Sequence, residues 1–253
     1  MRLAHSIVGS ENAAPLVLVH GITESRRSWD PIVERLQGTY RVLTVDLRAH
    51  GESPLGDAYD PVSYANDVVE TATAISIERP VVIGHSLGGV VASAVAAISS
   101  VRGGINVDQP LRLSGFKDSL TQLEPMLRGS VAEFEQAIDM VFQMMEGPLA
   151  DPERTRIRSL RRPTQSVVLG TWESVFTSTP EELDATVGAL AGAIRVPYLS
   201  LHGIDPGPDY APWLTSVLAT ATVETWADQG HYPHLIDPDR FVGLVNSFVA
   251  TLG

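Results

Sequence analysis

The sequence lacks cysteine, is poor in positive charge and has no long apolar run. The absence of cysteine excludes thiol catalysis, disulfide bonds and thiolate-bound metals. Lysine and arginine together number 18 against 30 aspartates and glutamates, and the formal net charge of −12 would repel a phosphate backbone. No basic stripe with interleaved aromatic residues offsets this charge, so we expect no binding to nucleic acid.

Membrane and leader segments are not expected either. No window approaches the ~18 consecutive apolar residues that a membrane-spanning helix needs. Residues 1–9 contain no long apolar core of the kind found in secretory signal peptides. No set of metal ligands stands out, and no cofactor is expected. We therefore predict a cytoplasmic protein whose partner is a small molecule, with no membrane contact, as a monomer or a homodimer.

The sequence does contain a regular alternation of short apolar runs and helical patterns. With 253 residues, 44% of them hydrophobic, the chain is near the upper limit for one hydrophobic core. Strands are expected at residues 2–8, 16–19, 41–45, 80–83, 104–108, 196–203 and 222–226. This alternation predicts right-handed βαβ units and a mostly parallel sheet.

The alternation breaks from Leu111 to Ile194, where only helical patterns occur. One of them is an amphipathic helix that Ser130 is placed to cap, with apolar residues at helical spacing: Phe134, Ile138, Val141, Phe142 and Met145. We expect residues 111–194 to form a helical cap over the C-terminal edge of the sheet. Residues 1–110 and 195–253 then form the α/β core.

The segment Gly84-His85-Ser86-Leu87-Gly88 matches the G-x-S-x-G pattern of a nucleophile elbow. It follows the expected strand 80–83 and precedes an alanine- and valine-rich helical run from Leu87 to Ile98. In an elbow of this kind, small neighbours allow the backbone to turn sharply and present the serine. Ser86 is therefore predicted to be a nucleophile.

A serine hydroxyl needs a base to remove its proton, and an acid to orient that base. Among the histidines, His231 is the best candidate, because the Gly230–Pro233 segment follows the last expected strand at the same sheet edge as Ser86. His234 is a less favoured base. His20 and His50 precede the serine, and structural hydrogen bonding accounts for both.

The acid has two main candidates. Asp205 follows the next-to-last expected strand, and Asp108 ends the strand after the elbow helix. Either edge can present a carboxylate to His231; we favour Asp205, keep Asp108 open and regard Asp209 as a weaker third choice. The negative charge of an acyl-transfer transition state also needs two backbone N–H donors, for which we predict Leu87 and Ile22.

Several motifs occur together and in one order: His20-Gly21, residues 46–53, residues 84–89, residues 202–205 and Gly230-His231. With them the chain resembles the α/β-hydrolase superfamily, in its small capped branch of esterases, lactonases and C–C hydrolases. The resemblance implies an α/β-hydrolase fold: a mostly parallel sheet with helices on both faces, and a helical cap inserted after the strand that follows the nucleophile helix.

The sequence departs from the family pattern in two places. Only 19 residues precede His20, so a sheet of about seven strands is expected instead of eight. The family commonly has two residues between the glycine after the penultimate strand and the acid, whereas Ile204 stands alone before Asp205. In relatives resembling zearalenone lactonase the acid follows the strand after the elbow helix, and the segment 107–110 is similar to that arrangement.

The resemblance implies a serine hydrolase that cleaves a small carboxylic ester or lactone through an acyl-enzyme intermediate. C–C bond hydrolysis of a β-diketone by the same residues is an alternative. A non-catalytic ligand-binding protein on the same fold is a further one. A serine at the elbow argues against the epoxide-hydrolase and haloalkane-dehalogenase branches, which use an aspartate there.

Two further groups of side chains are considered: residues that could contact substrate, and a cluster of arginines. Residues expected to contact substrate are Phe134, Met140, Phe142, Met144 and Tyr232. For the four cap residues, regular helical spacing also fits the core of the cap. The second group is a basic cluster of Arg154, Arg156, Arg158, Arg161 and Arg162, for which we consider a solvated helix face, an anionic partner or salt bridges that close the cap.

Overall fold

A computed structural model describes residues 1–253 and contains one seven-stranded sheet in the order β1-β3-β2-β4-β5-β6-β7. Only β1 is antiparallel to its neighbour; the other pairs are parallel. The strands are β1 His5–Val8, β2 Pro15–Val19, β3 Arg41–Val45, β4 Val81–His85, β5 Gly103–Val107, β6 Tyr198–His202 and β7 Ala221–Thr225. The predicted fold class and number of strands are confirmed.

The first strand is shorter than the sequence predicts. It begins at His5 because the chain before it binds helix α2 (Pro61–Ala74) instead of a neighbouring strand. The Leu3 N–H donates to Thr71 Oγ1 over 2.9 Å, and the N-terminal ammonium of Met1 lies 2.5 Å from Asp67 Oδ1.

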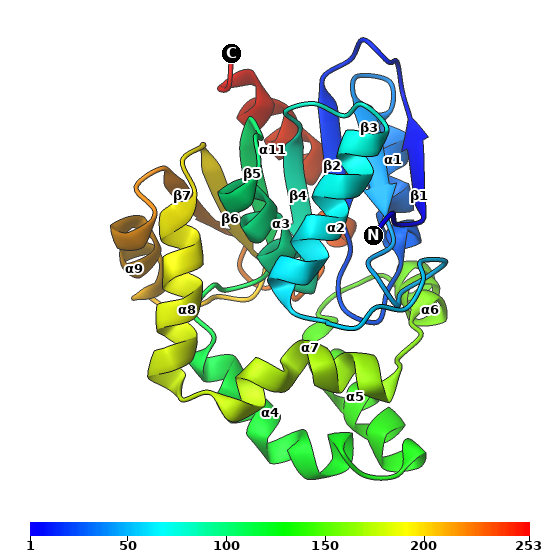
Figure 1. Cartoon of the computed structure of the whole chain (residues 1–253), viewed down its shortest axis with the longest axis vertical. Helices are drawn as coiled ribbons and strands as arrows, with labels where there is room; N and C mark the ends of the chain where they lie inside the picture. Colours follow the sequence, from blue (N-terminus) through cyan, green and yellow to red (C-terminus); the bar gives the residue numbers. More distant parts are fainter.

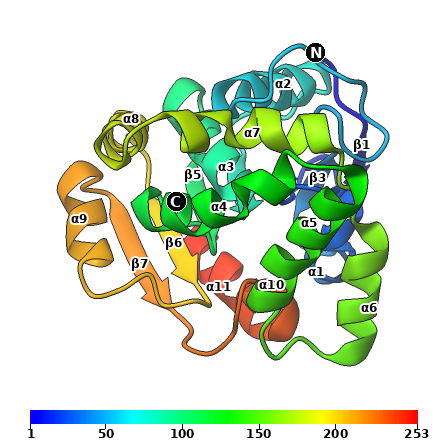
Figure 2. The same cartoon turned by 90° about the horizontal axis from the view of Figure 1, so that it is seen from below.

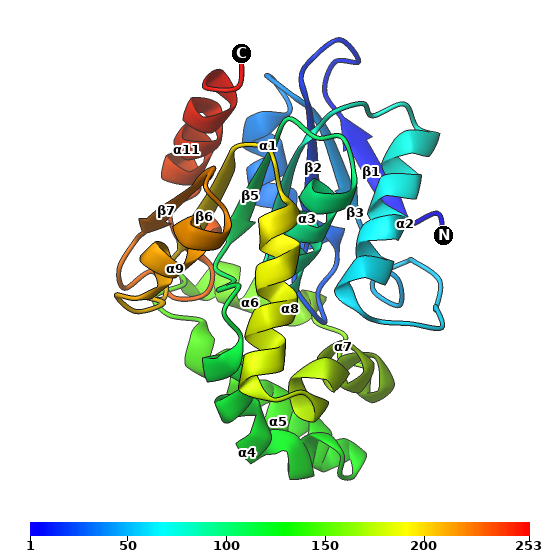
Figure 3. The same cartoon turned by 60° about the vertical axis from the view of Figure 1, so that its left-hand side comes forward.

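Helices cover both faces of the sheet, as Figures 1 and 3 show. On one face lie α2 and α3 (Leu87–Ile98); on the other lie α1 (Asp30–Leu36) and α11 (Pro238–Ala250). The strand side chains alternate between these faces, so that Val17 and Val19 face α2 and α3 while Leu16 and Leu18 face α1 and α11. The remaining helical segments of the core are η1 Arg26–Trp29, α9 Tyr210–Val217 and α10 Pro233–Ile236.

Five helices, here called the inserted helices, lie between β5 and β6. They are α4 Ser114–Leu127, α5 Val131–Met145, α6 Asp151–Leu160, α7 Gln165–Thr177 and α8 Pro180–Ala193. Ser130 caps α5, since its hydroxyl accepts from the Glu133 N–H while Glu133 accepts from the Ser130 N–H. Helices α4, α5 and α7 lie beyond the end of the sheet that carries Ser86, whereas α8 runs back beside α3 (Figures 1 and 2). No helix has the length and apolar character needed to cross a membrane.

His20 joins the loops that follow β2 and β3. Its Nε2 accepts from the Leu47 N–H over 3.0 Å, so Nδ1 carries the proton and donates to Gly21 O over 2.7 Å. Burial, and then the neighbouring His50, lower the pKa of His20 to about 3. The side chain is therefore neutral in the folded protein, in the structural role that the sequence favoured.

Burial of neutral His20 makes the stability of the fold depend on pH. The unfolded chain binds one more proton at this residue than the folded chain between its ordinary pKa of 6.5 and the folded pKa of about 3. The stabilisation is present above pH 6.5 and is lost as the pH falls through this range. Lowering the pH from 7 to 5 is expected to reduce the free energy of unfolding by about 2 kcal/mol through His20.

Urea unfolding of the wild type and of His20→Gln at pH 7, 6 and 5 measures this effect. The variant is expected to be less stable at pH 7 but to lose about 2 kcal/mol less than the wild type between pH 7 and 5. Identical pH dependence in the two proteins would contradict a neutral, buried His20.

Candidate active site

Ser86 lies at the sharp turn between β4 and α3, with backbone angles φ 54° and ψ −125°. A left-handed φ is strained for a residue with a side chain, and here the surrounding glycines maintain it. A Cβ atom on Gly84 would lie 1.8 Å from Gly88 O, and one on Gly88 would lie 2.2 Å from Val19 O. Only glycine fits at both positions, so the G-x-S-x-G pattern follows from the close packing of this turn against the end of β2.

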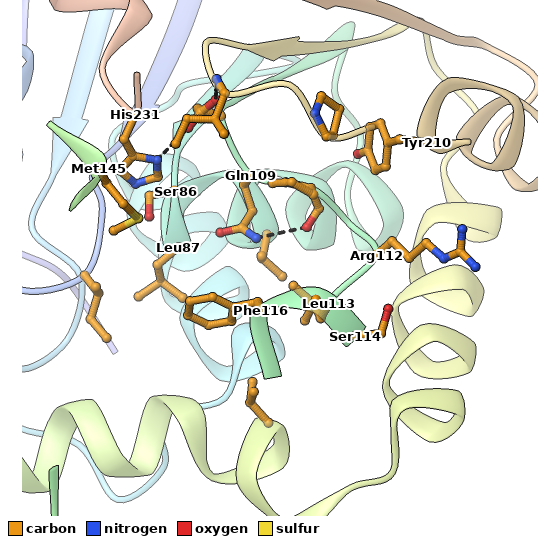
Figure 4. Close-up of a pocket in the computed structure, with 18 of the residues that line it drawn as sticks. Ser86, Leu87, Gln109, Arg112, Leu113, Ser114, Phe116, Met145, Tyr210 and His231 are labelled. Atoms are coloured by element: carbon orange, nitrogen blue, oxygen red, sulfur yellow. Dashed lines mark hydrogen bonds and ion pairs between the residues drawn. The ribbon is translucent and has the colours of Figure 1, made fainter. Parts of the chain in front are cut away.

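His231 lies in the loop between β7 and α10, and its Nδ1 is 2.6 Å from Asp108 Oδ2. Both side chains are buried. The His231 Nε2 atom has no hydrogen-bond partner within the protein. Figure 4 shows the imidazole of His231 beside Ser86. The structure thus brings together the predicted nucleophile, the predicted base and one of the two predicted acids.

Asp108 is held by the loop that follows β6. Its Oδ1 accepts from the Gly203 N–H over 2.7 Å and from the Ile204 N–H over 3.0 Å, while Oδ2 contacts His231. Burial alone would raise the pKa of Asp108, but the hydrogen bond and charge of His231 and the two N–H donors outweigh it and lower the pKa. Asp108 is therefore ionised at neutral pH and suited to stabilise an imidazolium.

Our preference for Asp205 as the acid is not supported by the geometry. The side chain is exposed, and its Oδ1 accepts from the Gly207 N–H of its own loop over 2.9 Å. The loop after β6 packs closely against the loop that carries His231, since a Cβ on Gly203 would lie 2.1 Å from Gly230 O. This loop supplies backbone donors to Asp108 instead of a carboxylate to His231. Asp209 precedes α9 and does not contact His231 either.

The predicted oxyanion donors Ile22 and Leu87 border the same pocket as Ser86. Leu87 is the first residue of α3, so its N–H has no acceptor within the helix. The Ile22 N–H also has no acceptor within the protein. A Cβ on Gly21 would lie 3.2 Å from Ser86 Cβ, which places the loop after β2 directly beside the serine. Two free backbone donors therefore flank Ser86.

The main chain of His231 is fixed on both sides of the residue. Its N–H donates to Met145 O, at the end of α5, over 2.8 Å. Its carbonyl oxygen lies 2.7 Å from His85 Nε2, which must donate. Burial, and next the neighbouring His231, lower the pKa of His85 to about 3, so His85 is neutral. His85, the residue before Ser86, thus helps to hold the main chain of His231.

The pocket beside Ser86 has a volume of about 510 Å³ and lies between the sheet edge and the inserted helices. Of the side chains predicted to contact substrate, Phe142 lines it. Phe134 packs in the core, Met140 and Met144 are exposed, and Tyr232 is fully buried with its hydroxyl bonded to Glu24. These four side chains therefore do not line the pocket. For the three that lie on α5, helical spacing shows which residues share a face but not which face meets the pocket.

Sequence reasoning missed most of the side chains that line the pocket. Among the lining side chains that were not predicted are Gln109, Leu113, Phe116, Trp172 and Val175. The Phe116 and Trp172 rings meet edge to face, with 5.8 Å between their centroids. Gln109 directly follows Asp108 at the sheet edge, and this position was the one available indication. Nothing in the sequence distinguished the stripe of α7 that carries Trp172 from other apolar stripes.

The basic cluster has partners within the protein. Glu146, which is buried, is surrounded by Arg154, Arg158 and Arg161, with nitrogen to oxygen distances of 3.6, 2.7 and 3.2 Å. Arg156 donates to Arg27 O and Ser28 O in η1. Of the three alternatives considered for this cluster, salt bridges agree with the geometry. They join residues of the inserted helices to one another around Glu146, and the hydrogen bonds of Arg156 attach these helices to the core.

Similar proteins agree with this fold. The chain is 33% identical over 99 residues to "Esterase YbfF" of Escherichia coli, covering 39% of each chain. It is 33% identical over 90 residues to "3-oxoadipate enol-lactonase 1" of Acinetobacter baylyi, covering 36% of this chain and 34% of that protein. It therefore spans well under half the length of these curated relatives.

A solved structure extends the likeness over nearly the whole fold. The crystal structure of a hydrolase from Pseudomonas aeruginosa superposes with a TM-score of 0.79 and 21% identity, covering 98% of this chain and 94% of that one. The model of the alpha/beta hydrolase family matches residues 16–244, which include Ser86, Asp108 and His231. This chain therefore belongs to the alpha/beta hydrolase family.

Proposed function

We propose that the protein is a serine hydrolase that cleaves a small carboxylic ester or lactone through an acyl-enzyme intermediate. The observation that carries the proposal is the buried pair between Asp108 and His231, 2.6 Å apart, beside Ser86 on a strained turn. Ser86 is the nucleophile, His231 the general base and Asp108 the residue that orients it. The Ile22 and Leu87 N–H groups supply the oxyanion hole.

The first half of the reaction forms the acyl-enzyme. Ser86 Oγ attacks the ester carbonyl carbon as its proton passes to His231 Nε2, and the carbonyl oxygen becomes an oxyanion that the two N–H groups stabilise. Asp108 stabilises the resulting imidazolium through Nδ1. When the intermediate collapses, Nε2 returns the proton to the leaving alkoxide, and the bond from the acyl carbon to the alcohol oxygen breaks.

The second half repeats these steps with water. His231 Nε2 takes a proton from water, whose oxygen attacks the acyl carbon, and the same donors stabilise the second oxyanion. Collapse breaks the bond to Ser86 Oγ, which regains its proton from His231. With a lactone, the alcohol released in the first half remains attached to the acyl group, and water completes ring opening.

The relatives support ester cleavage, since one is named an esterase and another an enol-lactonase. The walls of the pocket favour an apolar substrate of moderate size. The pocket has a volume of about 510 Å³ and is lined by Ser86 and by apolar side chains of the inserted helices. These side chains are Phe116, Phe142, Trp172 and Val175. In this proposal residues 111–194 act as the cap that selects the substrate.

The first test is hydrolysis of a graded series of uncharged acyl esters and lactones. We expect turnover that is greatest for apolar acyl groups which fill the pocket, and a fall of at least about 10³-fold in kcat for Ser86→Ala. A β-diketone of matched shape is assayed in parallel.

Three results would decide against the proposal. Preferential cleavage of the diketone would favour C–C bond hydrolysis. Tight retention of an unmodified ester without turnover would favour a binding protein. Unchanged ester turnover in Ser86→Ala would remove Ser86 from the reaction.

The second test compares the two predicted acids. Asp108→Asn is expected to lower kcat by about 10³ to 10⁴-fold, because an amide cannot stabilise the imidazolium and favours the wrong tautomer. Asp205→Asn is expected to change kcat less than about threefold, because its exposed carboxylate contacts only its own loop. Steady-state kinetics on one ester measures both, and a larger loss in Asp205→Asn would reverse the assignment.

A further inference from the structure

Three chain segments near the elbow contact one another. The loop after β2 carries the Ile22 N–H, the loop after β7 carries His231, and the chain from Glu146 to Arg162 belongs to the inserted helices. Buried polar side chains, none of which is used in the proposed reaction, connect all three segments.

The first link joins the oxyanion loop to the histidine loop. The Tyr232 hydroxyl donates to Glu24 Oε1 over 2.8 Å. Tyr232 is fully buried and Glu24 is 2% exposed. Burial, and then the charge of Glu24, raise the pKa of Tyr232 well above its ordinary value, so the hydroxyl keeps its proton and stays a donor.

The second link joins Tyr232 to the inserted helices. Arg161 Nη2 donates to the Tyr232 hydroxyl over 3.0 Å, and Nη1 donates to Glu146 Oε1 over 3.2 Å. The guanidinium also stacks over the Phe142 ring, with its Cζ 4.0 Å from the centroid. Burial opposes ionisation of Glu146, but Arg158 and Arg161 lower its pKa, so it remains a charged anchor.

Backbone contacts join the same segments as these side-chain hydrogen bonds. Met145, the residue before Glu146, accepts from the His231 N–H through its carbonyl oxygen. A Cβ on Gly147 would lie 2.8 Å from Gly230 Cα, so the two glycines pack backbone against backbone. The Arg162 N–H donates to Thr23 O, next to Glu24, over 2.7 Å. The same segment of the inserted helices therefore contacts both loops.

We propose that Glu24, Tyr232, Arg161 and Glu146 are positioning residues: one buried hydrogen-bonded chain through which the inserted helices hold the Ile22 donor and His231 in register with Ser86. The proposal rests on the proposed function for its catalytic consequence. It assigns to the arginine cluster a role in organising the site, beyond attachment of the helices.

The Tyr232 hydroxyl is the central group of this series of hydrogen bonds. It is the donor to Glu24 and the acceptor from Arg161, so its removal leaves a buried carboxylate and a buried guanidinium each short of a partner. Displacement of either loop by a fraction of an ångström affects proton transfer and oxyanion binding, which depend steeply on geometry. Substrate binding in the apolar pocket depends on it much less.

The test is Tyr232→Phe, with Tyr198→Phe as the matched control. Tyr198 is equally buried, and its hydroxyl lies 2.6 Å from Ser93 Oγ in the core, outside the pocket. We expect Tyr232→Phe to lower kcat for an apolar ester about 10- to 100-fold with KM changed less than about threefold, while Tyr198→Phe keeps kcat within about threefold.

Hydrogen exchange tests the link independently of activity. In Tyr232→Phe, amides of residues 22–25 and 230–235 are expected to exchange faster together, whereas Tyr198→Phe leaves both segments unchanged. Glu24→Gln, which keeps an oxygen to accept from Tyr232, should retain most of the kcat that Glu24→Ala loses. The double variant Tyr232→Phe with Arg161→Met should lose less than the product of the two single losses, because both break one chain.

Each outcome has a definite meaning. Equal behaviour of Tyr232→Phe and Tyr198→Phe in both assays overturns the proposal, and so does faster exchange in Tyr232→Phe with unchanged kcat. Independent losses in the double variant would also overturn it. A wild type that turns over no ester would overturn the proposed function instead. Hydrogen exchange of residues 22–25 and 230–235 would then decide on its own whether the buried hydrogen bonds connect the two loops.

Discussion

The hydrogen bond between Asp108 and His231 joins parts of the chain that the fold must bring together from opposite sides of β6. Asp108 directly follows β5, His231 follows β7, and the loop after β6 lies between them and donates two N–H groups to the carboxylate. Because the pair is buried, solvent screens the electrostatic interaction between the Asp108 carboxylate and the imidazole only weakly. Sheet order, loop paths and the close approach of Gly203 to Gly230 are all conditions for this one contact.

The inserted helices complete the site in two different ways. Their apolar side chains, such as Phe116 and Trp172, form the far wall of the pocket. Their polar side chains include Glu146 and Arg161, which bond to each other, and Arg161 also donates to Tyr232 in the loop that carries His231. Under the proposed function, substrate selection and the geometry of the reacting groups would depend on the same segment, because it carries both the apolar wall and the polar anchor.

Much of the fold and half of the site could be predicted from the sequence. Short apolar runs with helical patterns between them sufficed for a seven-stranded, mostly parallel sheet, and local chemistry sufficed for Ser86 and His231, because the elbow and the loop after the last strand are local features. The choice of Asp108 over Asp205 required the actual paths of two loops. The exposure of Met140 and Met144 depends on which face of α5 meets the core, and the partners of the arginines come from distant segments.

The most direct test of the account is the site and rate of modification by an organophosphonate, measured by mass spectrometry of the digested protein. A phosphonate reports on nucleophile, base and oxyanion donors together, because it forms a tetrahedral adduct. If Asp108 orients His231 beside Ser86, we predict one adduct, on the peptide that contains Ser86. It should form far more slowly in Asp108→Asn than in Asp205→Asn. No adduct on Ser86, or equal rates in the two aspartate variants, would contradict it.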